Sequence, residues 1–122
     1  MLDIVIPVTA IKTAPMSKSL KRIKAALAEA GVQAEVLEMA GETRTAADAA
    51  REASCDIDQI AKSIIFRGDA SGRTVLFITA GGNQVAPDKA GSLAGEALGR
   101  ADAVFVREMT GFAIGGVAPI AH

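Results

Sequence analysis

The order of helical and extended segments in the chain predicts a mixed α+β fold. Near the N-terminus, apolar residues recur at helical spacing, and later two short apolar runs flank a polar, turn-rich loop that is typical of an antiparallel hairpin. Helices and strands do not alternate regularly, so an α+β or mixed α/β arrangement is favoured over a doubly wound parallel sheet. The 122 residues are enough for one domain with a modest core.

Three segments carry helix signals, namely a capping residue or proline at the start and, for the first and third, a glycine just beyond the end. The predicted helices run from Ser17 to Ala30, from Thr45 to Ser54 and from Pro87 to Leu98. In the first, the apolar residues at helical spacing are Leu20, Ile23, Leu27 and Ala30, and Gly31 is the stop. The second opens with a weak capping box in which Asp48 takes the place of Glu or Gln.

Five apolar or alternating segments predict strands. They are 32–39, Gln59–Arg67, Thr74–Thr79, Ala103–Arg107 and Phe112–Ile114. The loop Gly68–Gly72 is polar and rich in turn residues, so the two strands that flank it should form an antiparallel hairpin.

Composition and charge exclude several classes of function. The net charge of −1 excludes a general electrostatic attraction to nucleic acid, although residues 1–24 hold five basic residues against one acidic residue. This basic stretch is either a solvated helix face or a local contact for nucleic acid.

The chain has one cysteine, Cys55, which we interpret as a packing residue, and one histidine, His122. An intrachain disulfide and a zinc cluster are therefore excluded, and a reducing, cytoplasmic location fits. No run approaches ~20 apolar residues, so we expect no membrane span.

Lys62 departs from the pattern of its own strand. The two-residue period of Gln59–Arg67 puts Lys62 on the same face as Ile60, Ile64 and Phe66. A cation on an apolar face costs free energy unless it is paired or reaches water at the mouth of a pocket. Either the strand is an edge from which the lysine reaches solvent, or Lys62 binds an anionic or ester-bearing ligand.

A glycine-rich segment near the end of the chain is the second candidate. Its residues are Gly115, Gly116, Val117, Ala118 and Pro119. The glycines allow backbone to approach a bound group closely, whereas the structural alternative is a tight turn between two strands. Neither a dinucleotide-binding nor a P-loop motif is present, and the carboxylates of Asp56 and Asp58 lie in what reads as an ordinary loop.

Four segments occur together in one order along the chain. They are Thr43–Ala50, Gln59–Arg67, Gly81–Val85 and Thr110–Pro119. The set resembles the YbaK/EbsC family, which is related to the editing domain inserted in bacterial prolyl-tRNA synthetases, and it covers roughly residues 17–122. The lysine strand and the T-G-F-x-I-G-G-V-x-P block are specific in combination. The resemblance implies a mostly antiparallel, barrel-like mixed sheet with flanking helices.

The resemblance also implies a trans-acting aminoacyl-tRNA deacylase that needs no cofactor. Such an enzyme hydrolyses the ester that joins a wrong, small amino acid to the 3′-terminal ribose of a tRNA. Lys62 would engage the terminal adenosine and hold the ester, and the backbone of Gly115–Pro119 would line the aminoacyl pocket. Thr43 and Thr45 lie in a segment that the family places near the pocket. The implied partners are the 3′ end of an aminoacyl-tRNA and, as a further possibility, an aminoacyl-tRNA synthetase.

The resemblance sets two expectations for the limits of the domain. Residues 1–15 are expected to be an N-terminal extension, because Met16 looks like a natural start, and residues 16–122 form the editing domain. Family members continue past the glycine-proline loop through another strand and helix that carry a pocket aspartate, and we expect this chain to lack them. A non-catalytic binding remnant of the same domain is therefore the alternative to the deacylase.

Overall fold

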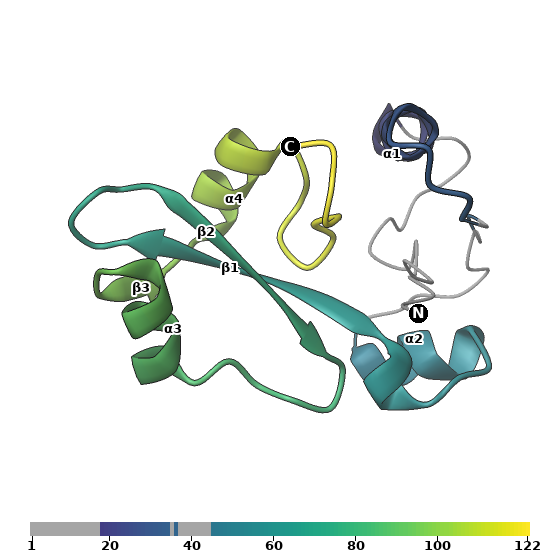
Figure 1. Ribbon diagram of the computed structural model, residues 1–122. Helices are drawn as coiled ribbons and strands as arrows, with labels where there is room; N and C mark the ends of the chain where they lie inside the picture. Colours follow the sequence, from purple (N-terminus) through teal and green to yellow (C-terminus); the bar gives the residue numbers. More distant parts are fainter. Residues whose placement is uncertain (1–17, 35, 37–44) are drawn as a thin grey trace.

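A three-stranded antiparallel sheet lies at the centre of the computed structural model, which describes residues 18–34, 36 and 45–122 (Figure 1). The middle strand, β1 (Ala61–Gly68), pairs with β2 (Thr74–Ala80) over seven residue pairs, from Ala61 opposite Ala80 to Arg67 opposite Thr74. The third strand, β3 (Leu98–Arg100), pairs only with the far end of β1, from Phe66 to Gly68. The predicted α+β class and the hairpin are confirmed.

The sheet is open in the part of the chain that the structure describes, so the closure expected of a barrel-like sheet is absent there. The pairing is antiparallel among these three strands, which agrees with the mostly antiparallel sheet that was expected. Because β3 stops at Arg100, residues 61–65 of β1 pair on one side only within this sheet.

The main hydrophobic core forms where α1 (Lys18–Glu29) packs beside the C-terminal part of the chain. The predicted helical periodicity is confirmed for Leu20, Ile23 and Leu27, which are all buried. Ala30, the fourth residue of the predicted set, lies beyond the end of α1 and is exposed. Gly31 follows in the left-handed conformation that ends helices, with a φ of +68°. The predicted cap Ser17 lies outside the described residues. The buried residues of this core are Leu20, Ile23, Leu27, Ala101, Val106, Phe112, Val117 and Ala118.

A smaller core lies at the start of β1. The helix α2 (Ala46–Glu52) begins at Thr45 with the predicted capping box, in which the Thr45 hydroxyl accepts from the Asp48 backbone and the Asp48 side chain accepts from Thr45. It is followed by a 3₁₀ turn, η2 (Ile57–Gln59), where a continuous strand from Gln59 was predicted. The buried residues of this smaller core are Ala49, Ala50 and Ile60.

The segment Ala103–Thr110 forms the helix α4, so the strand predicted at Ala103–Arg107 is wrong. Alternating apolar residues suit either structure over so short a stretch, and the caps decide between them. The Asp102 side chain accepts a hydrogen bond from the Phe105 backbone at 2.8 Å, and Gly111 ends the helix with a φ of +78°. The strand predicted at Phe112–Ile114 is also absent, because bends and turns follow the helix.

The helix α3 (Pro87–Ala94) starts at the predicted proline but ends earlier than predicted. Gly95 stops it in the left-handed conformation, with a φ of +77°. Gly99, expected to be the stop, instead lies in β3 opposite Arg67.

Of the predicted strand 32–39, residues 32–34 and 36 have no strand geometry and the rest lie outside the described residues. Figure 1 shows α4 above and α3 below the crossing strands.

Candidate functional site

Lys62 lies near the start of β1, on the strand face that carries Ile64 and Phe66. The register places Thr79 of β2 directly opposite Lys62. The lysine is half-buried, and its Nζ donates a hydrogen bond to the backbone carbonyl oxygen of Asn83 at 2.5 Å. One of the three N–H groups is used in this way, so the ammonium keeps donors for an anion or a carbonyl oxygen.

The carbonyl that holds Lys62 belongs to a tight turn directly after β2. The Asn83 amide donates to the Ala80 carbonyl oxygen at 2.9 Å, and the Gly82 amide donates to Oδ1 of Asp58 at 3.0 Å. A Cβ at Gly81 would overlap the carbonyl oxygen of Ile57 in η2, and one at Gly82 would lie 2.5 Å from Asp58 Oδ1. The two glycines thus let the turn lie directly against η2. The contact of Asp58 with this turn was not predicted from the sequence.

The Gly115–Pro119 loop is fixed by the main core. Val117 and Ala118 are 5% and 1% exposed, and they belong to the core cluster that also holds α1. Gly115 has a φ of +81°, a conformation that favours glycine, and Gly116 donates to the Ala113 carbonyl oxygen at 2.9 Å. Pro119 is half-buried. The loop therefore presents a preformed backbone rather than free side chains.

The structure does not join the predicted site residues into one cluster. Ile65 packs against the core that contains Val117 and Ala118, and Ile65 points to the face of β1 opposite to that of Lys62. Within residues 45–122, no hydrogen bond or ion pair connects Lys62 to the Gly115–Pro119 loop. Thr45 is the cap of α2, and Thr43 lies outside the described residues.

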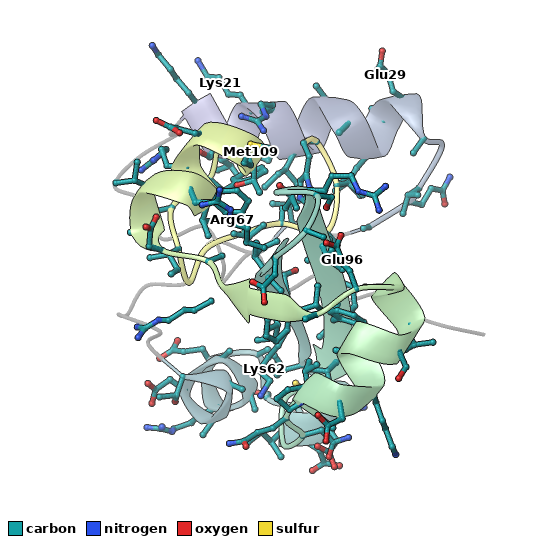
Figure 2. All side chains as sticks on the ribbon, turned by 90° about the vertical axis from the view of Figure 1, so that its left-hand side faces the viewer. Lys21, Glu29, Lys62, Arg67, Glu96 and Met109 are labelled. Atoms are coloured by element: carbon teal, nitrogen blue, oxygen red, sulfur yellow. The ribbon has the colours of Figure 1, made fainter. Side chains whose placement is uncertain are left out.

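The basic stretch on α1 lies far from Lys62, as Figure 2 shows for Lys21. One member, Arg22, is already engaged in the fold. Its Nη2 donates to the carbonyl oxygen of Thr110 at 2.7 Å, and its Nε donates to that of Ala121 at 2.9 Å. Its guanidinium carbon lies 4.4 Å from the centre of the Phe112 ring. Arg22 thus holds α1 against the C-terminal part of the fold. The lysines of this stretch, Lys18, Lys21 and Lys24, are exposed.

Glu96 organises the hairpin loop between β1 and β2. Its Oε1 accepts from the Ser71 hydroxyl at 2.5 Å, and its Oε2 accepts from the Ser71 and Ala70 amides, each at 2.9 Å. These hydrogen bonds lower the pKa of Glu96 below its ordinary value, and the bond from the Ser71 hydroxyl has the largest effect. Figure 2 shows Glu96 near the middle of the molecule and above Lys62, and we assign it a structural role.

The described residues contain no group of three His, Cys, Asp or Glu side chains that could hold a metal ion. Among the described helices, none is long and apolar enough to cross a membrane.

A comparison with models of protein families identifies the family to which the chain belongs. The model of the aminoacyl-tRNA editing domain matches residues 40–122, which is more than half of the chain. The chain belongs to this family of editing domains. The resemblance inferred from the lysine strand and the glycine-proline block is therefore confirmed. A comparison with curated proteins gave no significant match.

Solved structures similar to this editing domain agree with the assignment. One is a candidate trans-editing enzyme for prolyl-tRNA synthetase, 40% identical, with a TM-score of 0.80 over 88% of this chain and 68% of that one. A scaffold protein from work on computational epitope grafting is 36% identical, with the same TM-score and coverage. Hypothetical protein APE2540 is 29% identical, with a TM-score of 0.75 over 82% of this chain and 66% of that one. The editing domain thus spans about two thirds of each of these chains.

Proposed function

We propose that this editing domain hydrolyses the ester bond of mischarged aminoacyl-tRNA carrying a small amino acid, acting in trans. The observation that carries the proposal is the Lys62 ammonium, which stands half-buried on an apolar strand face and is held by a backbone carbonyl. Family membership and the similarity to a candidate trans-editing enzyme support it.

The chemistry of the substrate makes such a site sufficient. An aminoacyl ester is already activated, and the neighbouring ribose hydroxyl or a held water supplies the nucleophile. The protein then has to position the groups and stabilise the negative charge that develops on the ester oxygen. Lys62 would hold the terminal adenosine and the ester, and the backbone of Gly115–Pro119 would line the aminoacyl pocket, with Thr43 and Thr45 nearby. A small pocket selects amino acids mainly by size, which suits a second sieve after a synthetase.

The open edge of β1 supports access to Lys62. Residues 61–65 of β1 pair only with β2 within the sheet, so Lys62 lies where no third strand covers the edge. The proposed substrate approaches this edge with its terminal nucleotide at Lys62 and its aminoacyl group toward the loop. We place the editing domain at residues 16–122 of this sequence, and an aminoacyl-tRNA synthetase is a proposed partner.

A deacylation assay with a lysine-matched control tests the proposal. The protein is incubated with tRNAs charged with Ala, Ser, Cys and Pro, alongside Lys62→Ala and Lys89→Ala, the latter changing an exposed lysine on α3. Lys62→Ala should lower kcat/KM for one or two small aminoacyl esters about 100-fold, as loss of an oxyanion-stabilising donor does. Lys89→Ala should match the parent. A folded Lys62→Ala protein with parental activity would refute the role of Lys62.

A second function, binding without turnover, is favoured by one observation. Lys62 and the Gly115–Pro119 loop belong to opposite faces of the sheet and share no hydrogen bond. A binding remnant would retain affinity for the aminoacyl-tRNA end through Lys62 and hydrolyse none of the four esters. The same panel, read by filter binding as well as hydrolysis, separates the two functions.

A further inference from the structure

We infer that Asp58 is a positioning residue, which orients Lys62 through the turn Gly81–Asn83. The inference rests on the proposed function of Lys62 and adds a residue that the family resemblance did not assign. Two hydrogen bonds form the connection: Gly82 N–H donates to Asp58 Oδ1 at 3.0 Å, and Lys62 Nζ donates to the carbonyl oxygen of the next residue, Asn83, at 2.5 Å. Asp58 thus holds the turn, and the turn holds the ammonium.

The surroundings of the turn show why the hydrogen bond to Asp58 is needed to hold it in place. It follows directly after the last residue of β2, and its only internal bond runs from the Asn83 amide to the Ala80 carbonyl oxygen. Gly82 and Asn83 are exposed, so packing alone does not fix them. Asp58 belongs to η2, which is anchored by the buried Ile60 and by close contact with Gly81. The aspartate therefore connects the exposed side of the turn to a packed element.

The carbonyl oxygen of Asn83 determines where the Lys62 ammonium lies, because Lys62 has a long and flexible side chain. A lysine that must meet a reacting ester loses rate when it samples other positions. Loss of the Asp58 bond should release the turn, widen the range of positions open to the ammonium, and lower kcat more than it raises KM.

The test compares four proteins by two readouts. Asp58→Ala removes the acceptor, Asp58→Asn keeps an oxygen in the same place without the charge, and Glu52→Gln removes a carboxylate charge from the exposed end of α2 nearby. The first readout is kcat and KM for the preferred aminoacyl-tRNA. The second is the rate at which an amine-reactive reagent labels Lys62, measured by mass spectrometry relative to Lys89 in the same molecule.

Asp58→Ala should lower kcat about fivefold and raise the relative labelling of Lys62 by a similar factor, the equilibrium effect of one ordinary hydrogen bond. Asp58→Asn should retain most of the activity and the parental labelling, and Glu52→Gln should match the parent in both. In a Lys62→Ala background, Asp58→Ala should cost no further activity. Equal labelling of Lys62 in the parent and Asp58→Ala would overturn the inference, as would equal losses in Asp58→Asn and Asp58→Ala. If the parent hydrolyses no ester, the proposed function fails, and the labelling alone decides whether Asp58 positions Lys62.

Discussion

Replacement of Arg22 by alanine should destabilise the domain by about 2 kcal/mol. The guanidinium joins α1 to the last residue of α4 through the Thr110 carbonyl oxygen, and to the end of the chain through that of Ala121. Each charge-assisted bond contributes about 1.5 kcal/mol at this exposed position, at the low end of the usual range because solvent screens it. The Phe112 ring adds about 0.5 kcal/mol, and freeing the arginine side chain returns about 1.5 kcal/mol.

This loss is large enough to measure by thermal unfolding. At roughly 2.1 cal/mol/K of unfolding entropy per residue, about 2 kcal/mol lowers the Tm of a 122-residue domain by about 8 °C. The assay is far-ultraviolet circular dichroism of the full chain, with the neighbouring Lys21→Ala as the control because Lys21 is exposed. Arg22→Lys should show about half of the loss, since one ammonium does not reproduce the planar fork.

An Arg22→Ala protein that melts within about 1 °C of Lys21→Ala would refute the structural role of Arg22. The result bears on function as well. Charge reversal across the basic stretch would combine unfolding with any loss of tRNA affinity, so Lys21 and Lys24 are the residues to reverse when that surface is tested.

Two further predictions concern local packing and pH. Gly81→Ala should destabilise the domain by about 1–3 kcal/mol, because the new Cβ overlaps the carbonyl oxygen of Ile57, and urea unfolding measures the loss; a variant as stable as the parent contradicts this packing. Because the hydrogen bonds of Ser71 lower the pKa of Glu96, the stability that they confer is complete above the unfolded-state pKa and is lost as pH falls through the folded-state pKa. Glu96→Gln should therefore be less stable than the parent at pH 7 and should lose less stability on acidification to pH 3; parallel pH profiles would exclude this linkage.

Local signals made much of the fold predictable from the sequence. The capping box at Thr45, the glycine stop at Gly31 and the polar loop Gly68–Gly72 each act within a few residues, and the elements they delimit are confirmed. In α4 the local pattern misled the prediction, because the apolar residues of Ala103–Arg107 alternate as in a strand, whereas the Asp102 side chain caps a helix. The strand β3 has three residues and exists through its pairing with β1, about thirty positions away, which no local pattern encodes.

In the candidate site, too, the local feature could be predicted from the sequence and the long-range contacts could not. The two-residue period singled out Lys62, because an isolated cation on an apolar face is visible in the sequence itself. Its partner was not visible, since the acceptor is the backbone carbonyl of Asn83, 21 residues away, and a carbonyl leaves no mark on residue type. The contact from Asp58 to the Gly82 amide escaped prediction for the same reason, since one of its two partners is backbone.

The different settings of Lys62 and the Gly115–Pro119 loop decide how the proposed function can be tested. Val117 and Ala118 are core residues, so changing them removes buried contacts of α1 and α4, and a loss of activity would not separate chemistry from folding. Lys62 is half-buried with its ammonium on a single exposed hydrogen bond, so its truncation costs the fold little. A loss of deacylation in a stable Lys62→Ala protein is therefore attributable to the ammonium itself, and this residue carries the functional argument.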